Sequence, residues 1–142
     1  MRAHLSRRFH FSASHRLHTD SLSAADNQAT FGKCNNPFGH GHNYMVEVTF
    51  SGRVDPHTGM VANLSDLDAF AQQYLLGPFD QVNLNTLDLF HDLVPTTENL
   101  SVVLHGIFQR FPNAHLERLH VEETANNSFD FAGEALPPAG RY

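Results

Sequence analysis

The sequence predicts an α+β domain in which strands lie toward both ends of the chain and two amphipathic helices lie between them. Residues 5–15 and 40–52 alternate apolar and polar side chains with the period of a half-buried strand. Residues 63–76 and 95–111 instead repeat apolar side chains at helical spacing. Strands that flank a block of helices are typical of the α+β class.

The two N-terminal strands each carry histidine on their apolar face. In the first strand, the residues of that face are Phe9, Phe11, Ala13 and His15. In the second strand, they are His40, His42, Tyr44, Val46, Val48 and Phe50. Neighbouring strands joined by a connection commonly pair antiparallel. In that pairing His15 comes close to His40 and His42.

The two predicted helices have recognisable ends. The first follows a cap at Asn63 or Ser65, and we expect Gly77 and Pro78 to end it. The second opens on a Thr cap and ends before Pro112.

The C-terminal part of the chain has the pattern of a closing hairpin. Residues 117–124 and 128–133 read as its two strands, joined around Asn126 and Asn127.

Composition limits the classes of ligand. The chain has 142 residues, 41% of them hydrophobic, and fits one domain over residues 1–142. Its 9 Lys and Arg against 15 Asp and Glu give a formal charge of −6, which argues against nucleic-acid or membrane partners and favours a small molecule.

The single cysteine cannot form an internal disulfide, and the polar N-terminus does not resemble a signal peptide. We therefore expect a cytoplasmic protein.

The predicted histidine trio has two interpretations. A His-x-His pair alone is more often surface or packed histidine than a metal site. A third histidine on the same apolar face strengthens the metal interpretation, since three unpaired imidazoles are costly to bury. Three neutral His15, His40 and His42 side chains would hold a zinc ion and leave its fourth position open, as in catalytic zinc sites.

Cys34 and Glu123 are the other candidates for chemistry. Cys34 is either a small buried hydrophobe or a reactive thiolate, and its polar loop beside Lys33 favours the reactive form. Glu123 ends an otherwise apolar strand face. It either anchors a ligand that has an amino-imino edge, such as a pterin, or lies exposed at the strand end. Thr97 and Glu98 have a purely structural explanation as helix cap and first-turn acid.

Five blocks between about Phe9 and Gly133 resemble the 6-pyruvoyl-tetrahydropterin synthase family. They are FSASHRL, FGKCNNPFGHGHNY, GMVANLSDLD, PTTENLS and VEETANN, in that order. The spacing between Cys34 and His40 is similar to the pyruvoyl branch, whereas the 6-carboxytetrahydropterin synthases of the queuosine pathway usually have a shorter gap.

The resemblance implies a tunnelling fold. In this fold a four-stranded antiparallel sheet carries two helices on one face and assembles edge to edge into an oligomeric barrel. The implied assembly is a homo-oligomer, a trimer or a dimer of trimers, and such pairing would cover open strand edges.

The resemblance also implies a lyase reaction and its residues. The family substrate is 7,8-dihydroneopterin triphosphate, which loses triphosphate and is converted to 6-pyruvoyl-tetrahydropterin. By motif match, zinc is held by His15, His40 and His42, and catalysis involves Cys34 and Asp80. The pterin pocket is formed by Glu123, Thr97 and Glu98. For the triphosphate, Lys33, Arg16 and Arg8 are the candidate cations.

One position departs from the family pattern. Where the family usually has Asp-His, this chain has Asp80 followed by Gln81. Glutamine cannot carry a titrating proton near neutral pH, although His91 is a possible substitute. The alternatives are a slower enzyme, a 6-carboxytetrahydropterin synthase or side-chain-cleaving variant, and a pterin-binding paralogue with little turnover.

Overall fold

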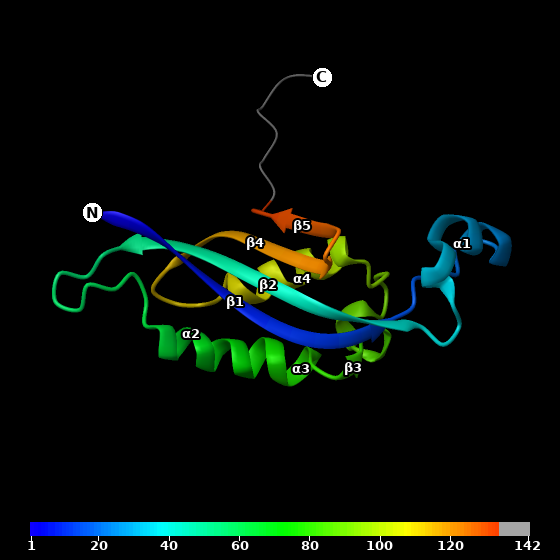
Figure 1. Ribbon diagram of the computed structural model, residues 1–142, viewed down its shortest axis with the longest axis horizontal. Coiled ribbons are helices and arrows are strands. Elements are labelled where there is room, and N and C mark those ends of the chain that lie inside the picture. Colours follow the sequence, from blue (N-terminus) through cyan, green and yellow to red (C-terminus); the bar gives the residue numbers. More distant parts are fainter. Residues whose placement is uncertain (134–142) are drawn as a thin grey trace, which may run out of the picture.

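The computed structural model describes residues 1–133, which form a single sheet with most of its helices on one face and one helix beyond the end of the long strands (Figure 1). The five strands are β1 (Arg2–His15), β2 (His40–Arg53), β3 (Val82–Asn83), β4 (His115–Thr124) and β5 (Asn127–Phe131), in the order β3-β1-β2-β4-β5. The α-helices are α1 (Ala24–Phe31), α2 (Leu64–Ala71), α3 (Gly77–Phe79) and α4 (Thr97–Phe108). Within residues 1–133, no helix combines the length and apolar character needed to cross a bilayer.

The predicted pairing of the two long strands is confirmed. β1 and β2 run antiparallel over their full length, and His15 lies opposite His40. Two rows further along, Ala13 lies opposite His42. The C-terminal hairpin also forms, but its turn is Ala125 and Asn126, because Asn127 already pairs with Thr124.

The four antiparallel strands that were expected are present as β1, β2, β4 and β5, but the expected total of four is wrong. A fifth strand, β3, pairs parallel with β1 at Ala13 and Ser14. The preceding turn attaches to Ser12, since the Ser12 N–H donates to Asp80 Oδ1 at 2.8 Å and the Gln81 N–H donates to the Ser12 carbonyl at 2.6 Å. A two-residue strand is too short to show an alternating pattern, so the sequence gives no signal for it.

The first long helix continues past the residues that were expected to end it. After α2 the chain makes a wide π-type turn over residues 72–76, and the Gly77 N–H donates to the Gln72 carbonyl. Helix α3 then includes Pro78. In a π-type turn the backbone N–H groups pair with the carbonyl five residues earlier, not four. This shift accommodates Pro78, which has no N–H to donate.

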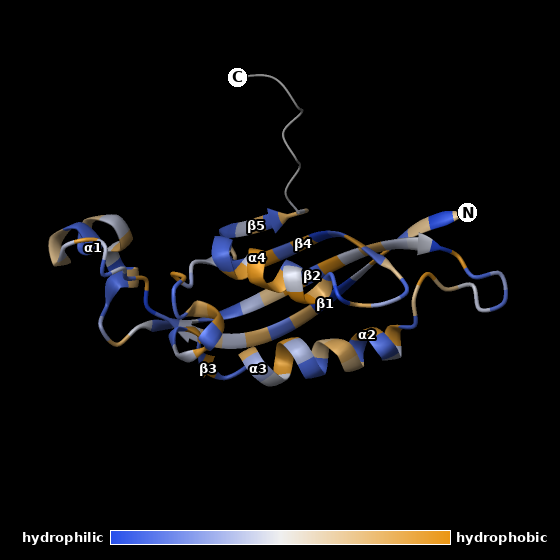
Figure 2. Cartoon of the chain, turned by 180° about the vertical axis from the view of Figure 1, so that it is seen from behind, coloured by the Kyte–Doolittle hydropathy of each residue, from blue (hydrophilic) through white to orange (hydrophobic). Residues whose placement is uncertain are grey.

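The hydrophobic core lies between the sheet and the helices. Figure 2 shows hydropathy alternating along the long strands and apolar residues concentrated on α4. Leu100, Leu104 and Phe108 of α4 are fully buried, and the Phe108 ring lies 6.1 Å from that of Phe9 on β1. Truncating one such leucine to alanine would cost about 2–5 kcal/mol of unfolding free energy.

The connection between β1 and β2 is more ordered than the sequence predicts. It contains α1, capped by Ser23, and a 3₁₀ turn over Gly32–Asn35. The Leu17 N–H donates to the Cys34 carbonyl at 2.8 Å, and Asn35 Nδ2 donates to the Leu17 carbonyl at 2.8 Å. These bonds hold the Cys34 turn against the end of β1.

Candidate active site

Three histidines converge at one end of the sheet. A nitrogen from each of His15, His40 and His42 lies within 4.8 Å of the others. His15 is 1% exposed and the other two are half-buried. The predicted convergence is therefore confirmed, and among residues 1–133 this is the group with a geometry suited to a metal ion.

The tautomer of His15 follows from its partner. His15 Nδ1 lies 2.8 Å from the Pro95 carbonyl oxygen, which can only accept, so Nδ1 carries the proton. The lone pair is consequently on Nε2, which lies 3.2 Å from His40 Nε2. Two nitrogens bound to one tetrahedral zinc at 2.0–2.1 Å would be about 3.3 Å apart. The spacing of this pair fits a shared cation.

His42 supplies a second sign of a metal site. Its Nε2 atom is buried and makes no hydrogen bond in the described part of the chain, although Glu123 Oε1 lies 3.0 Å away. Burial lowers the pKa of His42 and of His15, so both favour the neutral form that binds metals. The three imidazoles fit a divalent cation such as zinc.

A buried carboxylate adjoins the histidines. Glu123 is the penultimate residue of β4. Its side chain is 14% exposed, and the Thr97 hydroxyl donates to Glu123 Oε2. The alternative interpretation, in which Glu123 lies exposed at the end of its strand, is therefore wrong. Thr97 is also not the helix cap: Thr96 Oγ1 caps α4 by accepting from the Asn99 N–H, which leaves Thr97 in the first turn facing Glu123.

Cys34 lies beside the cluster, but its electrostatic surroundings differ from the expectation. Cys34 and His40 line the same cavity of about 600 Å³, together with Lys33. Burial, and then the negative charge of Glu123, raise the pKa of the Cys34 thiol. The protein's own groups therefore favour the thiol, and a nearby cation is needed to favour the thiolate.

Two predicted site residues lie apart from this group. Glu98 is exposed in the first turn of α4 and, within residues 1–133, has no hydrogen bond or ion pair through its side chain. Asp80 accepts the Ser12 N–H at the edge of the sheet, as described above. The sequence alone could not show which of Thr97 and Glu98 faces the site. The exact first residue of a helix is uncertain by one position, and that position decides which side chain points inward.

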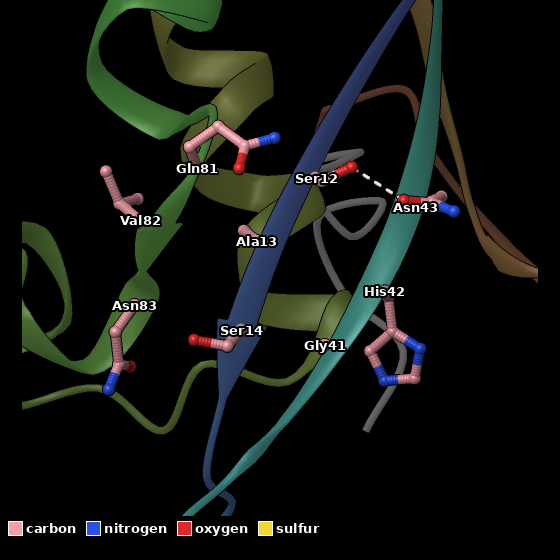
Figure 3. Close-up of a pocket in the computed structure, with 9 residues that line it drawn as sticks. All are labelled: Ser12, Ala13, Ser14, Gly41, His42, Asn43, Gln81, Val82 and Asn83. Atoms are coloured by element: carbon pink, nitrogen blue, oxygen red, sulfur yellow. Dashed lines mark hydrogen bonds between the residues drawn. The ribbon is translucent and has the colours of Figure 1, made fainter.

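Gln81 lines a second cavity, of about 370 Å³, whose other lining residues include Ser12, Asn43 and His42 (Figure 3). The His42 imidazole is directed away from Gln81 in this view (Figure 3). The backbone of Gln81 has φ +61°, a left-handed conformation that is uncommon outside glycine. Within one chain, the Asp80-Gln81 turn is thus bonded to β1, and Gln81 shares a cavity with His42 of the histidine cluster.

The three residues proposed to bind the triphosphate differ in their position relative to the candidate site. Arg8 Nε lies 2.7 Å from Glu47 Oε2 in an exposed cross-strand pair on the side of the sheet that faces away from the core. Arg16 Nε donates to the Asn35 carbonyl at 3.1 Å, near the Cys34 turn. Lys33 lines the cavity that contains Cys34. Only Lys33 and Arg16 therefore lie on the Cys34 side.

One further polar residue of the site was not singled out from the sequence. Tyr44 is 1% exposed, and its hydroxyl lies 3.5 Å from His15 Nδ1. Burial, followed by the charge of Glu123, raises the pKa of Tyr44. The sequence feature that could have identified Tyr44 is its position on the same strand face as His40 and His42.

The fold and the site define a two-layer α+β protein with a three-histidine centre beside a cysteine and a buried carboxylate. The sequence model of the 6-pyruvoyl tetrahydropterin synthase family matches residues 4–134. The chain therefore belongs to that family.

Individual relatives agree with this assignment. The human 6-pyruvoyl tetrahydrobiopterin synthase is 47% identical over 134 residues, which cover 93% of this chain and 92% of the human protein. The enzyme of the same name from Drosophila melanogaster is 47% identical over 135 residues, 92% of this chain and 80% of its own length. The solved structure of Caenorhabditis elegans 6-pyruvoyl tetrahydropterin synthase superimposes with a TM-score of 0.89 at 37% identity, covering 94% of this chain and 97% of that one.

Proposed function

We propose that this protein is a zinc-dependent lyase that converts 7,8-dihydroneopterin triphosphate to 6-pyruvoyl-tetrahydropterin with loss of triphosphate. The observation that carries the proposal is the convergence of His15, His40 and His42 beside Cys34 and Glu123. Membership of the 6-pyruvoyl tetrahydropterin synthase family supports the same reaction.

The metal would be held by the three histidine nitrogens. Bound by these residues, zinc would supply Lewis-acid chemistry, which would polarise a substrate hydroxyl group and make the attached carbon more acidic. His15 is oriented for this role by its Nδ1 bond to the Pro95 carbonyl, a type of contact that typically fixes the tautomer of a metal-binding histidine.

Glu123 would hold the pterin ring. A carboxylate can accept two parallel N–H bonds from an amino-imino edge, and such charge-assisted pairs are stronger than neutral ones. Thr97 donates to Oε2 and orients the carboxylate for this contact. Because the side chain of Glu123 is only 14% exposed, the ligand would displace little water from it.

Cys34 would remove the proton from the substrate side chain. Its turn is held in place by the Leu17 and Asn35 bonds, beside the cavity that His40 also lines. In the net reaction, two side-chain alcohol carbons are oxidised to carbonyls. This oxidation is balanced by reduction of the dihydropterin ring to the tetrahydro level and by conversion of the carbon that loses the triphosphate to a methyl group, so no external oxidant is required. Protons pass between the carbons and the enzyme's acid-base groups.

We also propose assembly of this chain into a homo-oligomer, a trimer or a dimer of trimers. The described sheet ends in two short edge strands, β3 and β5, whose outer backbone groups are available for pairing. Edge-to-edge contact would cover them.

A second candidate function is pterin binding with little turnover. The observation that favours it is Gln81, an amide at the position where the family usually has a histidine. If that position takes part in proton transfer, the amide cannot replace it.

A product assay separates these candidates. Zinc-loaded protein is incubated with 7,8-dihydroneopterin triphosphate, and triphosphate release and product mass are measured. Release together with the mass of 6-pyruvoyl-tetrahydropterin is expected. The mass of a carboxy or side-chain-cleaved pterin would replace the proposed product by the corresponding variant. Pterin affinity without release would favour the binding protein.

A further inference from the structure

Asn35, the residue after Cys34, holds the Cys34 turn against the segment that follows β1. The residue is buried, with 7% of its surface exposed. Its Nδ2 atom donates one hydrogen to the Leu17 carbonyl at 2.8 Å, and its carbonyl accepts from Arg16 Nε at 3.1 Å. Because Leu17 comes two residues after His15 of the metal cluster, these bonds help to set the position of Cys34 relative to that cluster.

The second hydrogen of the Asn35 amide is accepted by His18. Asn35 Nδ2 lies 3.0 Å from His18 Nδ1, and an amide NH₂ group can only donate, so Nδ1 is the acceptor. His18 is then neutral and carries its proton on Nε2, which lies 3.2 Å from Asp20 Oδ1 and donates to it. The hydrogen-bonding role of each atom in this chain of contacts is therefore fixed.

The other groups that face His18 are exposed. His18 lines a cavity of about 380 Å³ with Asp20, His91 and Asp92. Asp20 lies fully at the surface, and His91 pairs with Asp92 at 3.0 Å while both side chains are largely exposed. Exposed ion pairs contribute little to stability, whereas a buried donor left without a partner is costly. The bond to Asn35 is thus the more important of the two side-chain contacts of His18.

We propose that His18 is a positioning residue for Cys34. Its neutral Nδ1 atom holds the Asn35 amide, and Asn35 holds the turn that carries the thiol. Without this acceptor one hydrogen of a buried amide is unpaired, and the turn has to shift until water reaches it. The inference rests on the proposed function because it gives Cys34 a role in turnover, but the position of the thiol can be measured without turnover.

Alkylation by iodoacetamide reports on Cys34 alone, because the chain has no other cysteine. His18→Leu removes the acceptor. His18→Asn keeps one, since the asparagine Oδ1 and the histidine Nδ1 are both bonded to Cγ, and the new side chain does not titrate. His57→Leu is the matched control, because His57 is exposed and follows the Arg53 end of β2, whereas Cys34 precedes the opposite end (Figure 1).

At about pH 7.5, alkylation of the half-buried thiol should be roughly 2- to 10-fold faster in His18→Leu than in the wild type, which is the range expected for one lost hydrogen bond. The kcat for triphosphate release should fall by a similar factor with little change in KM. His18→Asn and His57→Leu should match the wild type, and zinc content and circular dichroism should be unchanged throughout. Wild-type alkylation and kcat in His18→Leu would overturn the inference.

A second pH separates this role from simple packing. Imidazole is protonated in mildly acidic solution, and protonated His18 donates from both nitrogens, so the wild type loses the Asn35 bond while His18→Asn keeps it. The wild-type alkylation rate divided by that of His18→Asn should therefore rise roughly 2- to 10-fold between about pH 7.5 and about pH 5.5. Titration of the thiol itself cancels in this ratio. A ratio that does not change with pH would refute the proposed role of the neutral imidazole.

The two proposals fail in different ways. If Cys34 alkylation responds to His18 as expected in a protein that releases no triphosphate, the proposed function is refuted and the positioning role stands. If triphosphate is released but alkylation is the same in all variants, this inference alone is refuted.

Discussion

His42 Nε2 lies 3.0 Å from Glu123 Oε1, so a histidine of the predicted metal cluster touches the carboxylate at the end of β4. The two residues are far apart in the sequence and are brought together because β2 pairs with β4. This contact places the candidate ligand anchor directly beside the metal cluster.

Replacing Glu123 by glutamine should weaken pterin binding. A hydrogen bond to a charged group contributes about 1.5–3 kcal/mol, so a loss of roughly 10- to 100-fold in affinity is expected. Fluorescence titration with dihydroneopterin measures it. Glu122→Gln is the matched control, because the Glu122 side chain is 48% exposed and faces away from the cluster. Equal affinities in both variants would remove Glu123 from the ligand pocket.

Removing a histidine of the cluster should abolish stoichiometric metal binding. His40→Ala leaves only two of the three grouped nitrogens. Metal analysis after dialysis against zinc is expected to show a strong loss of bound zinc relative to the wild type. His91→Ala is the control, since that side chain is 81% exposed and outside the cluster. Undiminished zinc in His40→Ala would contradict the assignment.

Cys34→Ala should separate chemistry from binding. General base catalysis contributes about 10²–10⁴-fold to rate, and a loss in this range is expected in triphosphate release. Zinc content and pterin affinity should stay at wild-type values, because Cys34 supplies neither contact in the proposed scheme. Turnover unchanged by the substitution would show that the thiol is not the base.

Gln81→His should raise turnover if the amide limits proton transfer. Imidazole titrates near neutral pH, and histidine tolerates the left-handed backbone found here at φ +61°. Triphosphate release is compared among wild type, Gln81→His and the control Gln81→Asn, which keeps an amide. If the histidine variant is no faster than the wild type, the identity of this residue does not limit the reaction.

His105 should make stability depend on pH. It is 7% exposed on α4, and burial, followed by the charge of His115, lowers its pKa in the folded state. Above about pH 6.5 the residue is neutral in both states, so its contribution to stability is fully present there. As the pH falls below that value, the unfolded chain binds a proton that the folded state resists. The unfolding free energy then falls by at most about 1.4 kcal/mol per pH unit from this group.

Urea unfolding at about pH 7.5 and about pH 5.5 checks this expectation. His105→Leu should show a smaller loss between the two conditions than the wild type. His91→Leu, at an exposed position, should behave as the wild type. An identical pH dependence in all three proteins would show that His105 does not contribute.

Periodicity in the sequence determined the long elements and the histidine trio. A strand period of two residues puts His40 and His42 on one face, and antiparallel pairing of β1 with β2 then places His15 beside them. These features follow from local alternation plus one commonly observed pairing, so they can be read without coordinates.

Only the tertiary structure decided the rest. It showed that Thr97 faces Glu123 while Glu98 is exposed, that Asp80 is bonded to Ser12, and that a fifth strand, β3, lies beside β1. It also reversed the expected shift in the pKa of Cys34, because burial and then the charge of Glu123 raise that pKa. The physical reason is that periodicity reports which face a residue occupies, whereas contact distances, burial and electrostatic potential depend on segments that the sequence does not place next to one another.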